Sequence, residues 1–432
     1  MKTDCIVLGA GIVGVSTALH LQARGRDVVL VDKHALAGEE TSFGNAGLIE
    51  RSSIYPYSLP RDFGQLLKYA FNRAPEAHYH LSALPSVLPW IFRYAMKSGK
   101  KETLKSAMAS LPLIERCVLE HEVLMAQAGV PELAVKSGWI KVFRQNKSLE
   151  GGLKDADKIK RFGVNFDVLN PLEIALREPH LNGAFKGAVH YTDPVFVPDP
   201  GALVKAYAAL FKARGGRMSV GDASSLAQTA KGWRVMVEGG ALDAAHAVVC
   251  LGPWAGGVFH RLGYNIPLGI KRGYHMHYQR QGNAVLNHSV IDADNGYLIA
   301  PMTKGIRLTT GAEFAKLDAP KTPVQLAKVE PIARTLFPLA ERLDMEPWMG
   351  ARPCLPDMLP VVGPAPKHRG LWFNFGHEHH GLTLGPVTGR LLAEMLTGEA
   401  PIHQSRPISG RSVLNTIARD AREVLCRVGV QG

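Results

Sequence analysis

Short apolar runs that lead into glycine or aspartate mark the beginning of the chain. Residues 4–9 read Asp-Cys-Ile-Val-Leu-Gly and residues 27–31 read Asp-Val-Val-Leu-Val, and both patterns favour strands that are buried on two faces. Between them, residues 12–24 have the apolar spacing of a helix, which we expect to stop at Gly25. A strand, a helix and a second strand within about 30 residues form the unit that a right-handed parallel crossover requires. The pattern therefore predicts a parallel sheet covered by helices.

This alternation stops after the second strand and returns near the end of the chain. Residues 56–112 read as helical, with many aromatic residues and with interruptions by proline. Strand-like runs associated with glycine return at residues 246–251, 360–363 and 371–375, and we expect a helix over residues 386–396. The pattern indicates that insertions divide one domain into several segments.

The turn after the first strand carries candidate chemistry. Residues 9–14 read Gly-Ala-Gly-Ile-Val-Gly and match the G-x-G-x-x-G pattern of dinucleotide-binding turns. Gly9 permits the tight turn, Gly11 lets the backbone approach a pyrophosphate, and Gly14 lets the helix lie close to the strand. Asp32, at the end of the second strand, can accept hydrogen bonds from ribose hydroxyls. The pattern predicts a bound dinucleotide, although its spacing does not distinguish NAD from FAD.

Composition adds little to this picture, and charge adds one feature. The 46% hydrophobic and 20% charged residues are typical of a globular enzyme, and no apolar run reaches 18 residues, so we expect a cytoplasmic protein. The five cysteines show no CxxC spacing, which argues against a disulfide framework or a zinc ribbon. The net charge of +12 raises the question of a nucleic-acid or membrane partner. Most basic residues are spread along the chain, and we expect no nucleic-acid partner.

One basic cluster stands apart from the rest. Residues 89–94 read Pro-Trp-Ile-Phe-Arg-Tyr and are followed by Lys97, Lys100, Lys101 and Lys105. Aromatic and cationic side chains mixed in this way are typical of peripheral membrane segments. The alternative is a solvated helix with an aromatic side that faces the core. The solvated helix is the simpler interpretation, and a peripheral contact with the inner membrane is the second interpretation that the cluster leaves open.

Three segments resemble motifs of a known family. Residues 40–49 read Glu-Thr-Ser-Phe-Gly-Asn-Ala-Gly-Leu-Ile, residues 350–363 follow a G-x-R-P-x-x-P-D-x-x-P-x-x-G pattern, and residues 376–390 form a glycine-rich turn that leads into a helix. In this order they resemble the FAD-dependent D-amino acid oxidase superfamily, and most closely its bacterial D-amino acid dehydrogenases. The resemblance implies an α/β (α+β) two-domain fold, with a Rossmann-like FAD-binding domain and an interleaved substrate domain built on an antiparallel sheet plus helices. The expected FAD-binding domain comprises residues 1–50, 198–260 and 345–400, the substrate-binding domain residues 51–197 and 261–344, and a C-terminal helical extension residues 401–432.

The resemblance also implies a cofactor site. We expect FAD to be held without a covalent bond, because Gly350 occupies the place of the flavin-linked cysteine of the related sarcosine oxidases. A helix that opens near Leu384-Gly385-Pro386 would aim its free N–H groups at the flavin. The histidines of residues 376–380 are expected to line the flavin and to bind no metal. The expected cofactor contacts are Gly9, Gly11, Ile12, Val13, Gly14, Asp32, Lys33, Thr41, Ser42, Asn45, Ala46, Gly47, Leu48, Ala223, Gly252, Trp254, Arg352, Gly376, His377, His379, His380, Gly381, Leu382 and Thr383.

Four residues are expected to contact the substrate, and no residue is assigned as catalytic. Arg352 lies at the signature position of the family's carboxylate-binding arginine, and its planar guanidinium suits a carboxylate. The alternative is a structural pair between Arg352 and Asp357. Tyr274 and His275 belong to an Arg-Gly-Tyr-His element of the substrate domain and are expected near the carboxylate or amine, unless they only pack a strand. Glu378 is expected to attract a cationic group of the substrate.

The resemblance implies oxidation of a D-amino acid to a 2-oxo acid and ammonia, with hydride transfer from Cα to flavin N5. The electrons are expected to pass to a quinone-type or other respiratory acceptor. Two alternatives stay open: a glycine-, sarcosine- or proline-type amine oxidase that uses oxygen, and a non-catalytic subunit that holds FAD.

Overall fold

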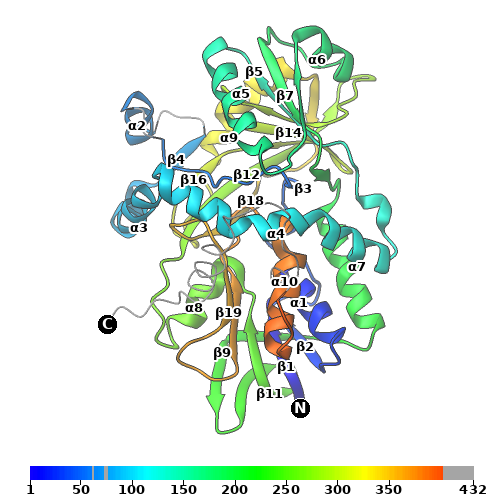
Figure 1. Ribbon diagram of the computed structural model, residues 1–432, viewed down its shortest axis with the longest axis vertical. Coiled ribbons are helices and arrows are strands. Elements are labelled where there is room, and N and C mark those ends of the chain that lie inside the picture. Colours follow the sequence, from blue (N-terminus) through cyan, green and yellow to red (C-terminus); the bar gives the residue numbers. More distant parts are fainter. Residues whose placement is uncertain (61–62, 73–75, 402–432) are drawn as a thin grey trace.

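The protein has a two-domain α/β fold (Figure 1). The computed structural model describes residues 1–60, 63–72 and 76–401, so the predicted C-terminal extension lies, from residue 402 on, outside the described residues. Figure 1 shows the domain that contains the N-terminus in its lower half and a second domain in its upper half. Helix α4 (Lys100–Gln127) crosses between the two.

A seven-stranded sheet organises the first domain. Strand β1 pairs in parallel with β2 on one side and with β11 on the other, β2 pairs in parallel with β9, and β11 pairs in parallel with β20. A meander joins β9, β10 and β11, and β19 forms the antiparallel edge. The strands are β1 (Lys2–Leu8), β2 (Val28–Asp32), β9 (Arg217–Thr229), β10 (Gly232–Val237), β11 (Gly240–Val249), β19 (Val361–Pro364) and β20 (Leu371–Phe375).

The apolar runs of β1 and β2 follow from burial on both faces of this sheet. Val7 and Leu30 belong to one core cluster, whereas Ile6 and Val31 belong to another on the opposite face. Helix α1 packs against α10 and α7 on the first of these faces. The helices of this domain are α1 (Ile12–Gln22), α7 (Pro200–Ala213), the short α8 (Ala255–Phe259) and α10 (Gly381–Thr397).

An eleven-stranded, mostly antiparallel sheet organises the second domain. Its central strand β12 pairs with β15, β16, β17 and β18, and the sheet continues through β14, β13, β5, β7 and β6. The strands are β4 (Ala77–Tyr79), β5 (Trp139–Phe143), β6 (Phe166–Leu169), β7 (Gly187–Tyr191), β12 (Gly269–Arg280), β13 (Ser289–Asp292), β14 (Tyr297–Met302), β15 (Gly305–Thr309), β16 (Ala312–Phe314), β17 (Leu339–Arg342) and β18 (Trp348–Cys354).

Helices surround this second sheet, and a short strand pair connects it to the first domain. Strand β3 (Leu48–Ile49) pairs with β8 (Val195–Phe196). In Figure 1, α5 and α6 lie at the top of the molecule, and α2 and α3 lie together at its left edge. The remaining helices are α2 (Phe63–Ala70), α3 (Leu84–Lys97), α5 (Asn146–Lys160), α6 (Pro171–Arg177) and α9 (Val324–Leu336), with short 3-10 turns η1 (Leu81–Ala83), η2 (Pro131–Leu133) and η3 (Gly252–Trp254).

The segments of the expected FAD-binding domain mostly meet in the seven-stranded sheet. Strand β18 is different, because it pairs with β12 of the other sheet along its whole length. The segment over residues 345–354 therefore reaches into the second domain. It carries Arg352 to the border between the two sheets.

Candidate active site

The turn between β1 and α1 has the geometry of an anion-binding loop. Gly9 has a φ of +102°, and a Cβ on Gly14 would lie 1.8 Å from the Gly9 carbonyl oxygen, so both positions require glycine. Gly11 precedes the first turn of α1 without a side-chain cap, and no acidic residue occupies that turn. Apart from the Ile12 N–H, the N–H groups at this end of α1 are thus available to a diphosphate. Val13 lies in this same turn, and Ile12 donates its N–H to Ser42 Oγ at 3.0 Å.

Asp32 and its neighbours form the next part of the loop. The Asp32 carboxylate accepts hydrogen bonds from Ala10 N (2.7 Å) and His34 N (2.9 Å). The Lys33 ammonium lies 4.6 Å from the centre of the Trp254 ring. Gly252 and Trp254 share the turn η3, and Ala223 lies on β9, the strand that pairs with β2. The structure thus brings Lys33 and Trp254 together beside the carboxyl end of β2.

The loop over residues 41–48 connects this turn to the second sheet. Thr41 Oγ1 donates to Ala351 O at 2.9 Å, and the Asn45 side chain accepts the N–H of Gly47 at 2.9 Å. Arg307 donates to Asn45 O. Ala46 is partly buried against the core, and Leu48 enters the strand pair β3–β8. The loop is therefore fixed from both domains.

The helix after the second glycine-rich turn starts earlier than its sequence pattern predicts. Helix α10 begins at Gly381, so the expectation that Pro386 belongs to the first turn is wrong. Proline has no N–H to donate to the carbonyl four residues before it, here that of Leu382. His121 from α4 replaces this bond, with Nε2 2.6 Å from Leu382 O. A contact from a distant helix thus lets α10 continue through the proline.

The start of α10 is tied to the segment that follows the 41–48 loop. Thr383 Oγ1 donates to Leu48 O at 3.2 Å and accepts from Glu50 N at 3.1 Å. Within the turn, Gly376 has a φ of +85° and Glu378 a φ of +56°. His377 is buried, with Nε2 3.0 Å from Thr388 Oγ1, and His380 Nε2 lies 2.8 Å from Ser53 Oγ. His377 and His380 are therefore held by close contacts.

Arg352 lies between these two loops. Its preceding residue, Ala351, accepts the hydrogen bond from Thr41, and its following residue, Pro353, accepts one from Glu378 N at 3.0 Å. The guanidinium lies over Gly273, where a Cβ would approach Arg352 Nη2 to 2.7 Å. Its one protein hydrogen bond within the described chain runs from Nη1 to Gly311 O at 3.2 Å, and no ion pair joins Arg352 to Asp357 or to another described carboxylate. The remaining donors are available to a ligand.

Two residues that the sequence did not single out complete this region. Tyr57 keeps 61% of its surface exposed, although burial of its hydroxyl raises the pKa above the usual range, and Arg352 is among the charges that act on it. The Tyr57 ring lies 4.9 Å from that of His379, and Glu50 Oε2 lies 3.9 Å from His379 Nε2 and 3.5 Å from His380 Nε2. Burial lowers the pKa of His379 well below its usual value, so its imidazole is neutral. Only the closeness of Glu50 and Tyr57 to the 41–48 loop could have pointed to them.

The register of β12 decides where the Arg-Gly-Tyr-His element points. Lys271 is paired directly with Arg352, Gly273 with Gly350, and His275 with Trp348, so these six residues share one face of the sheet. Arg272 and Tyr274 share the opposite face. His275 stacks on Trp348 with ring centres 4.7 Å apart, and burial, with help from Arg307, lowers its pKa to about 2. His275 therefore lies on the face of Arg352 as a neutral ring.

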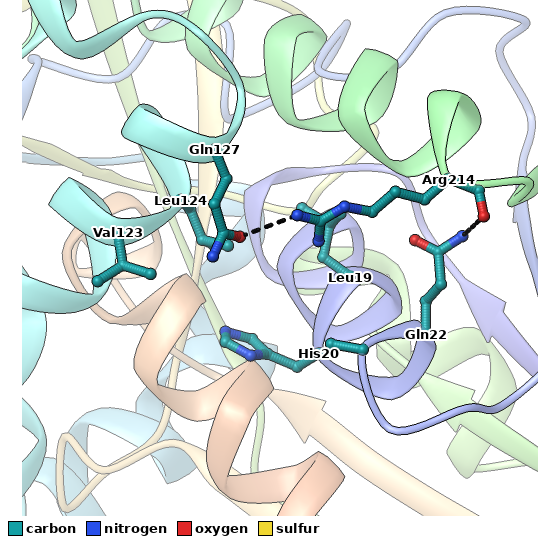
Figure 2. Close-up of a pocket in the computed structure, with 8 residues that line it drawn as sticks. Leu19, His20, Gln22, Val123, Leu124, Gln127 and Arg214 are labelled. Carbon is teal, nitrogen blue, oxygen red and sulfur yellow. Dashed lines mark hydrogen bonds between the residues drawn. The ribbon is translucent and has the colours of Figure 1, made fainter.

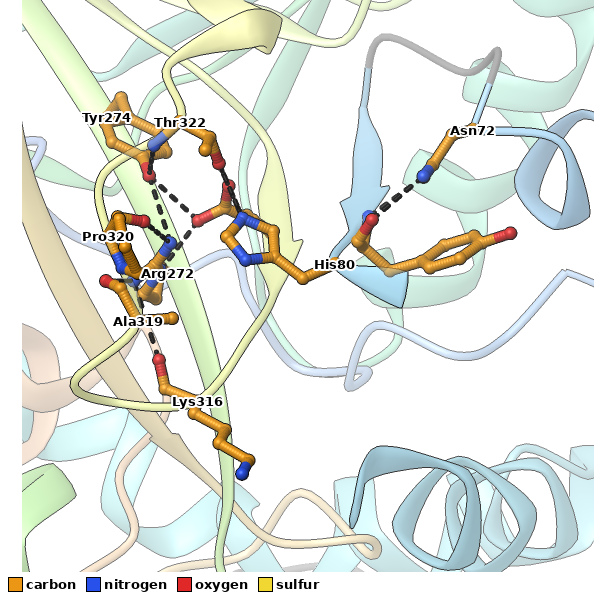
Figure 3. A network of polar contacts seen from close by, with 10 residues as sticks. Asn72, His80, Arg272, Tyr274, Lys316, Ala319, Pro320 and Thr322 are labelled. Carbon is orange, nitrogen blue, oxygen red and sulfur yellow. Dashed lines mark hydrogen bonds and ion pairs between the residues drawn. The ribbon is translucent and has the colours of Figure 1, made fainter. Parts of the chain in front are cut away.

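Tyr274 belongs to a polar network on that opposite face (Figure 3). Its hydroxyl donates to Glu313 Oε2 at 2.9 Å and accepts from Thr322 N at 2.9 Å. Arg272 Nε donates to the same Glu313 oxygen at 2.7 Å, and both side chains of this ion pair are fully buried. His80 Nε2 lies 2.6 Å from Thr322 Oγ1. The structure does not bring Tyr274 together with Arg352, and a substrate role for Tyr274 stays a prediction.

A separate hollow of about 460 Å³ lies between α1, α4 and α7 (Figure 2). Gln22 Nε2 donates to Arg214 O at 3.0 Å, and Arg214 Nη2 donates to Gln127 Oε1 at 3.3 Å. Burial, followed by the charges of Arg24 and Arg390, lowers the pKa of His20 to about 3. The lining of this hollow shares no residue with the loops around Arg352.

Together, the fold and these loops define a two-domain dinucleotide-dependent oxidoreductase. The chain belongs to the family described as FAD dependent oxidoreductase (DAO), whose model matches residues 4–395. FAD is therefore the cofactor, and the uncapped start of α1 and the close-packed glycine turn suit its diphosphate. The chain is 30% identical over 410 residues to a D-amino-acid oxidase of Bradyrhizobium diazoefficiens, which covers 93% of this chain and 97% of the relative.

Two further similarities support this assignment. A D-amino acid dehydrogenase of Xylella fastidiosa is 26% identical over 412 residues, with 90% of this chain and 91% of the relative covered. The crystal structure of a glycine oxidase from Geobacillus kaustophilus superposes with a TM-score of 0.70 and 21% identity, covering 95% of this chain and 99% of that one. At this identity, the glycine oxidase shows the shared fold alone.

Proposed function

We propose that the protein catalyses the FAD-dependent oxidative deamination of a D-amino acid to a 2-oxo acid and ammonia. The position of Arg352 carries this proposal. Its strand receives one hydrogen bond from each loop expected at the flavin, at Ala351 and at Pro353, and its guanidinium keeps donors for a ligand. A carboxylate bound there by two parallel hydrogen bonds would hold the Cα of an amino acid beside the flavin. The names of the relatives support the D configuration.

The residues around Arg352 suit the amino group as well as the carboxylate. When bound, FAD would supply the two-electron acceptor for the hydride removed from Cα. Glu50 offers a carboxylate to the substrate ammonium, and the neutral His379 imidazole offers Nε2, which has no hydrogen-bond partner among the described residues. The substrate reacts with its amine neutral, so that the amine lone pair is free for imine formation, and His379 Nε2 can accept a hydrogen bond from the amine N–H. Water then hydrolyses the imine to the 2-oxo acid and ammonia.

Anaerobic bleaching of the flavin tests this proposal directly. The purified holoenzyme is mixed with D- and L-enantiomers of alanine and glutamate, with glycine, sarcosine and proline, and the absorbance of oxidised flavin is followed. We expect bleaching by D-enantiomers. Bleaching by glycine or sarcosine alone would move the assignment to an amine oxidase of the same fold. A yellow protein that no amine bleaches would support a non-catalytic FAD-holding subunit.

We propose that the electrons pass to a quinone-type or other respiratory acceptor at a membrane surface. The outer face of α3 supports this proposal, because Leu88, Phe92 and Met96 follow one another at helical spacing and are 53–68% exposed. Exposed basic residues occur on α3 and at the start of the following helix, namely Arg93, Lys100, Lys101 and Lys105. Apolar side chains flanked by cations match an anionic bilayer surface. None of the described helices is both long and apolar enough to cross a membrane.

Vesicle sedimentation and reoxidation rates test this second proposal. We expect the holoenzyme to bind vesicles of mixed phosphatidylcholine and phosphatidylglycerol, to release them at high salt, and to lose about tenfold in affinity in the Phe92→Ser/Met96→Ser variant. Leu172→Ser is the matched control, because Leu172 is 72% exposed on α6, away from this face. Reduced flavin should reoxidise slowly in air and rapidly with a soluble quinone. Rapid peroxide formation, or vesicle binding that survives the double substitution, would contradict the proposal.

A further inference from the structure

Lys271 is a second cation on the face of Arg352. The two residues are direct partners in the β12–β18 register, so their side chains leave the sheet on the same side. Lys271 is only 9% exposed. Its ammonium lies 4.4 Å from the ring centre of Tyr94, 5.1 Å from that of Trp90 and 5.8 Å from that of Phe314. These rings shield the ammonium from water and attract its charge, but they do not neutralise it.

No anion balances this pair of cations within the described residues. Neither Lys271 nor Arg352 forms an ion pair there. Glu378 is the acid whose charge acts on Lys271, yet burial raises its pKa to about 8, so it is protonated at neutral pH. Within the part of the chain that the structure describes, its Oε1 is buried without a hydrogen-bond partner. A buried charge is destabilising unless a counter-charge accompanies it, so an anionic group of a ligand would stabilise the Lys271 ammonium.

We propose that the preferred substrate is an acidic amino acid, with its α-carboxylate at Arg352 and its side-chain carboxylate at the Lys271 ammonium. This inference rests on the proposed oxidation of an amino acid. The Cβ atoms of directly opposed residues lie about 5 Å apart, so both cations leave the sheet from neighbouring positions on one face. Lys271 is then a specificity-determining residue. The competing explanation is a purely internal Lys271–Glu378 pair that no ligand enters.

The test compares acidic substrates with their uncharged amides. D-Glutamate with D-glutamine, and D-aspartate with D-asparagine, differ chiefly in the side-chain charge, so the ratio of kcat/KM within a pair isolates the contact at Lys271. We expect the better acid to exceed its amide at least tenfold. Lys271→Met keeps the apolar stem and removes the charge, and should lower this ratio at least tenfold. Lys158→Met, an exposed lysine on α5, should leave the ratio unchanged.

Binding of unreactive analogues provides an independent measurement on the unmodified holoenzyme. Titration of the flavin spectrum should give a Kd for glutarate at least tenfold below that for butyrate, and Lys271→Met should remove this difference. Equal affinities for glutarate and butyrate, or an acid-to-amide ratio that Lys271→Met does not lower, would overturn the inference. Bleaching by D-alanine and the amides without preference for the acids would leave the proposed function standing. If no amino acid bleaches the flavin, the proposed function fails, whereas the glutarate titration still reports on Lys271.

Discussion

Buried charged side chains form ion pairs on one face of strand β12 and lack them on the other. On one face, Arg272 and Glu313 are fully buried and paired, and Tyr274 and Thr322 bind the same carboxylate. On the other face, Lys271 and Arg352 are opposed directly and have no anionic partner among the described residues. A fully paired buried network of this kind stabilises one arrangement of the chain. A buried charge without a counter-charge is instead a candidate binding position for an anionic ligand. Adjacent residues of one strand thus differ in role because their side chains point to different sides.

Glu313→Ala should remove the buried ion pair with Arg272 and have the largest effect on stability. It leaves the Arg272 guanidinium buried without its partner, so we expect a loss of about 3–5 kcal/mol in the free energy of unfolding. Denaturant unfolding of the holoenzyme measures this loss. Replacing both partners, as in Arg272→Met/Glu313→Leu, should cost less than Glu313→Ala alone. An equal or larger loss in the double variant would contradict the argument.

The same carboxylate should make the native protein sensitive to acid. Burial alone would raise the pKa of Glu313, but hydrogen bonds from Thr322, Arg272 and Tyr274 outweigh it and lower the pKa below 4.5. Its contribution to stability is therefore complete above pH 4.5 and is lost as the pH falls through the lowered value. Glu313→Ala should show a shallower loss of stability on this acid side.

Arg352→Met should act on the unpaired face and reduce activity without loosening the fold. We expect kcat/KM for D-amino acids to fall about 100- to 1000-fold, or about 3–4 kcal/mol, because the α-carboxylate loses its charged partner. FAD content and melting temperature should stay close to those of the unsubstituted protein. Arg352→Lys should recover only part of the loss, since an ammonium cannot form two parallel hydrogen bonds in a fixed plane. A large fall in melting temperature for Arg352→Met would instead indicate a structural role.

Tyr274→Phe tests whether the Tyr274 hydroxyl serves the buried polar network or contacts the substrate. The structure leads us to expect a loss of about 1–2 kcal/mol in stability, because Glu313 and Thr322 N lose a hydrogen-bond partner, together with a change in KM of less than about twofold. The family resemblance predicts instead a contact with the substrate. A tenfold rise in KM with unchanged stability would support that prediction.

The smallest expected effect is a pH dependence of KM that arises from Glu378. The groups whose charge or titration is coupled to this residue are Lys271, Asp357, Tyr94, Cys354 and His379. Because its raised pKa is about 8, Glu378 is neutral below that pH and negative above it, where it competes with a substrate carboxylate for Lys271. We expect KM for D-glutamate to rise a few-fold above pH 8, with little change for D-glutamine. Glu378→Gln should remove this rise, and a rise that persists in Glu378→Gln would assign it to another group.

The local patterns of the chain were sufficient for much of the fold. The first strand, its helix and the second strand lie where the apolar spacing predicts them, since both sheet faces are buried and the turn requires its glycines. Strand β20 has the predicted bounds. The start of α10 could not be predicted, because a hydrogen bond from His121, more than 250 residues earlier in the chain, compensates for Pro386. For the same reason the sequence did not indicate Glu50 and Tyr57, because no local pattern around them shows that they lie near Arg352.

The sequence by itself determined the dinucleotide turn, the family and the arginine that is expected to bind a carboxylate. Each depends on residues close together in the chain, where spacing carries the physical requirement. Only the tertiary structure decided which side chains share a face with Arg352. The Arg-Gly-Tyr-His element drew attention to Tyr274, but a strand places alternate residues on opposite sides, and the pairing of β12 with β18 places Lys271, not Tyr274, beside Arg352. That register arises from strands about 80 residues apart in sequence, so no local pattern could specify it.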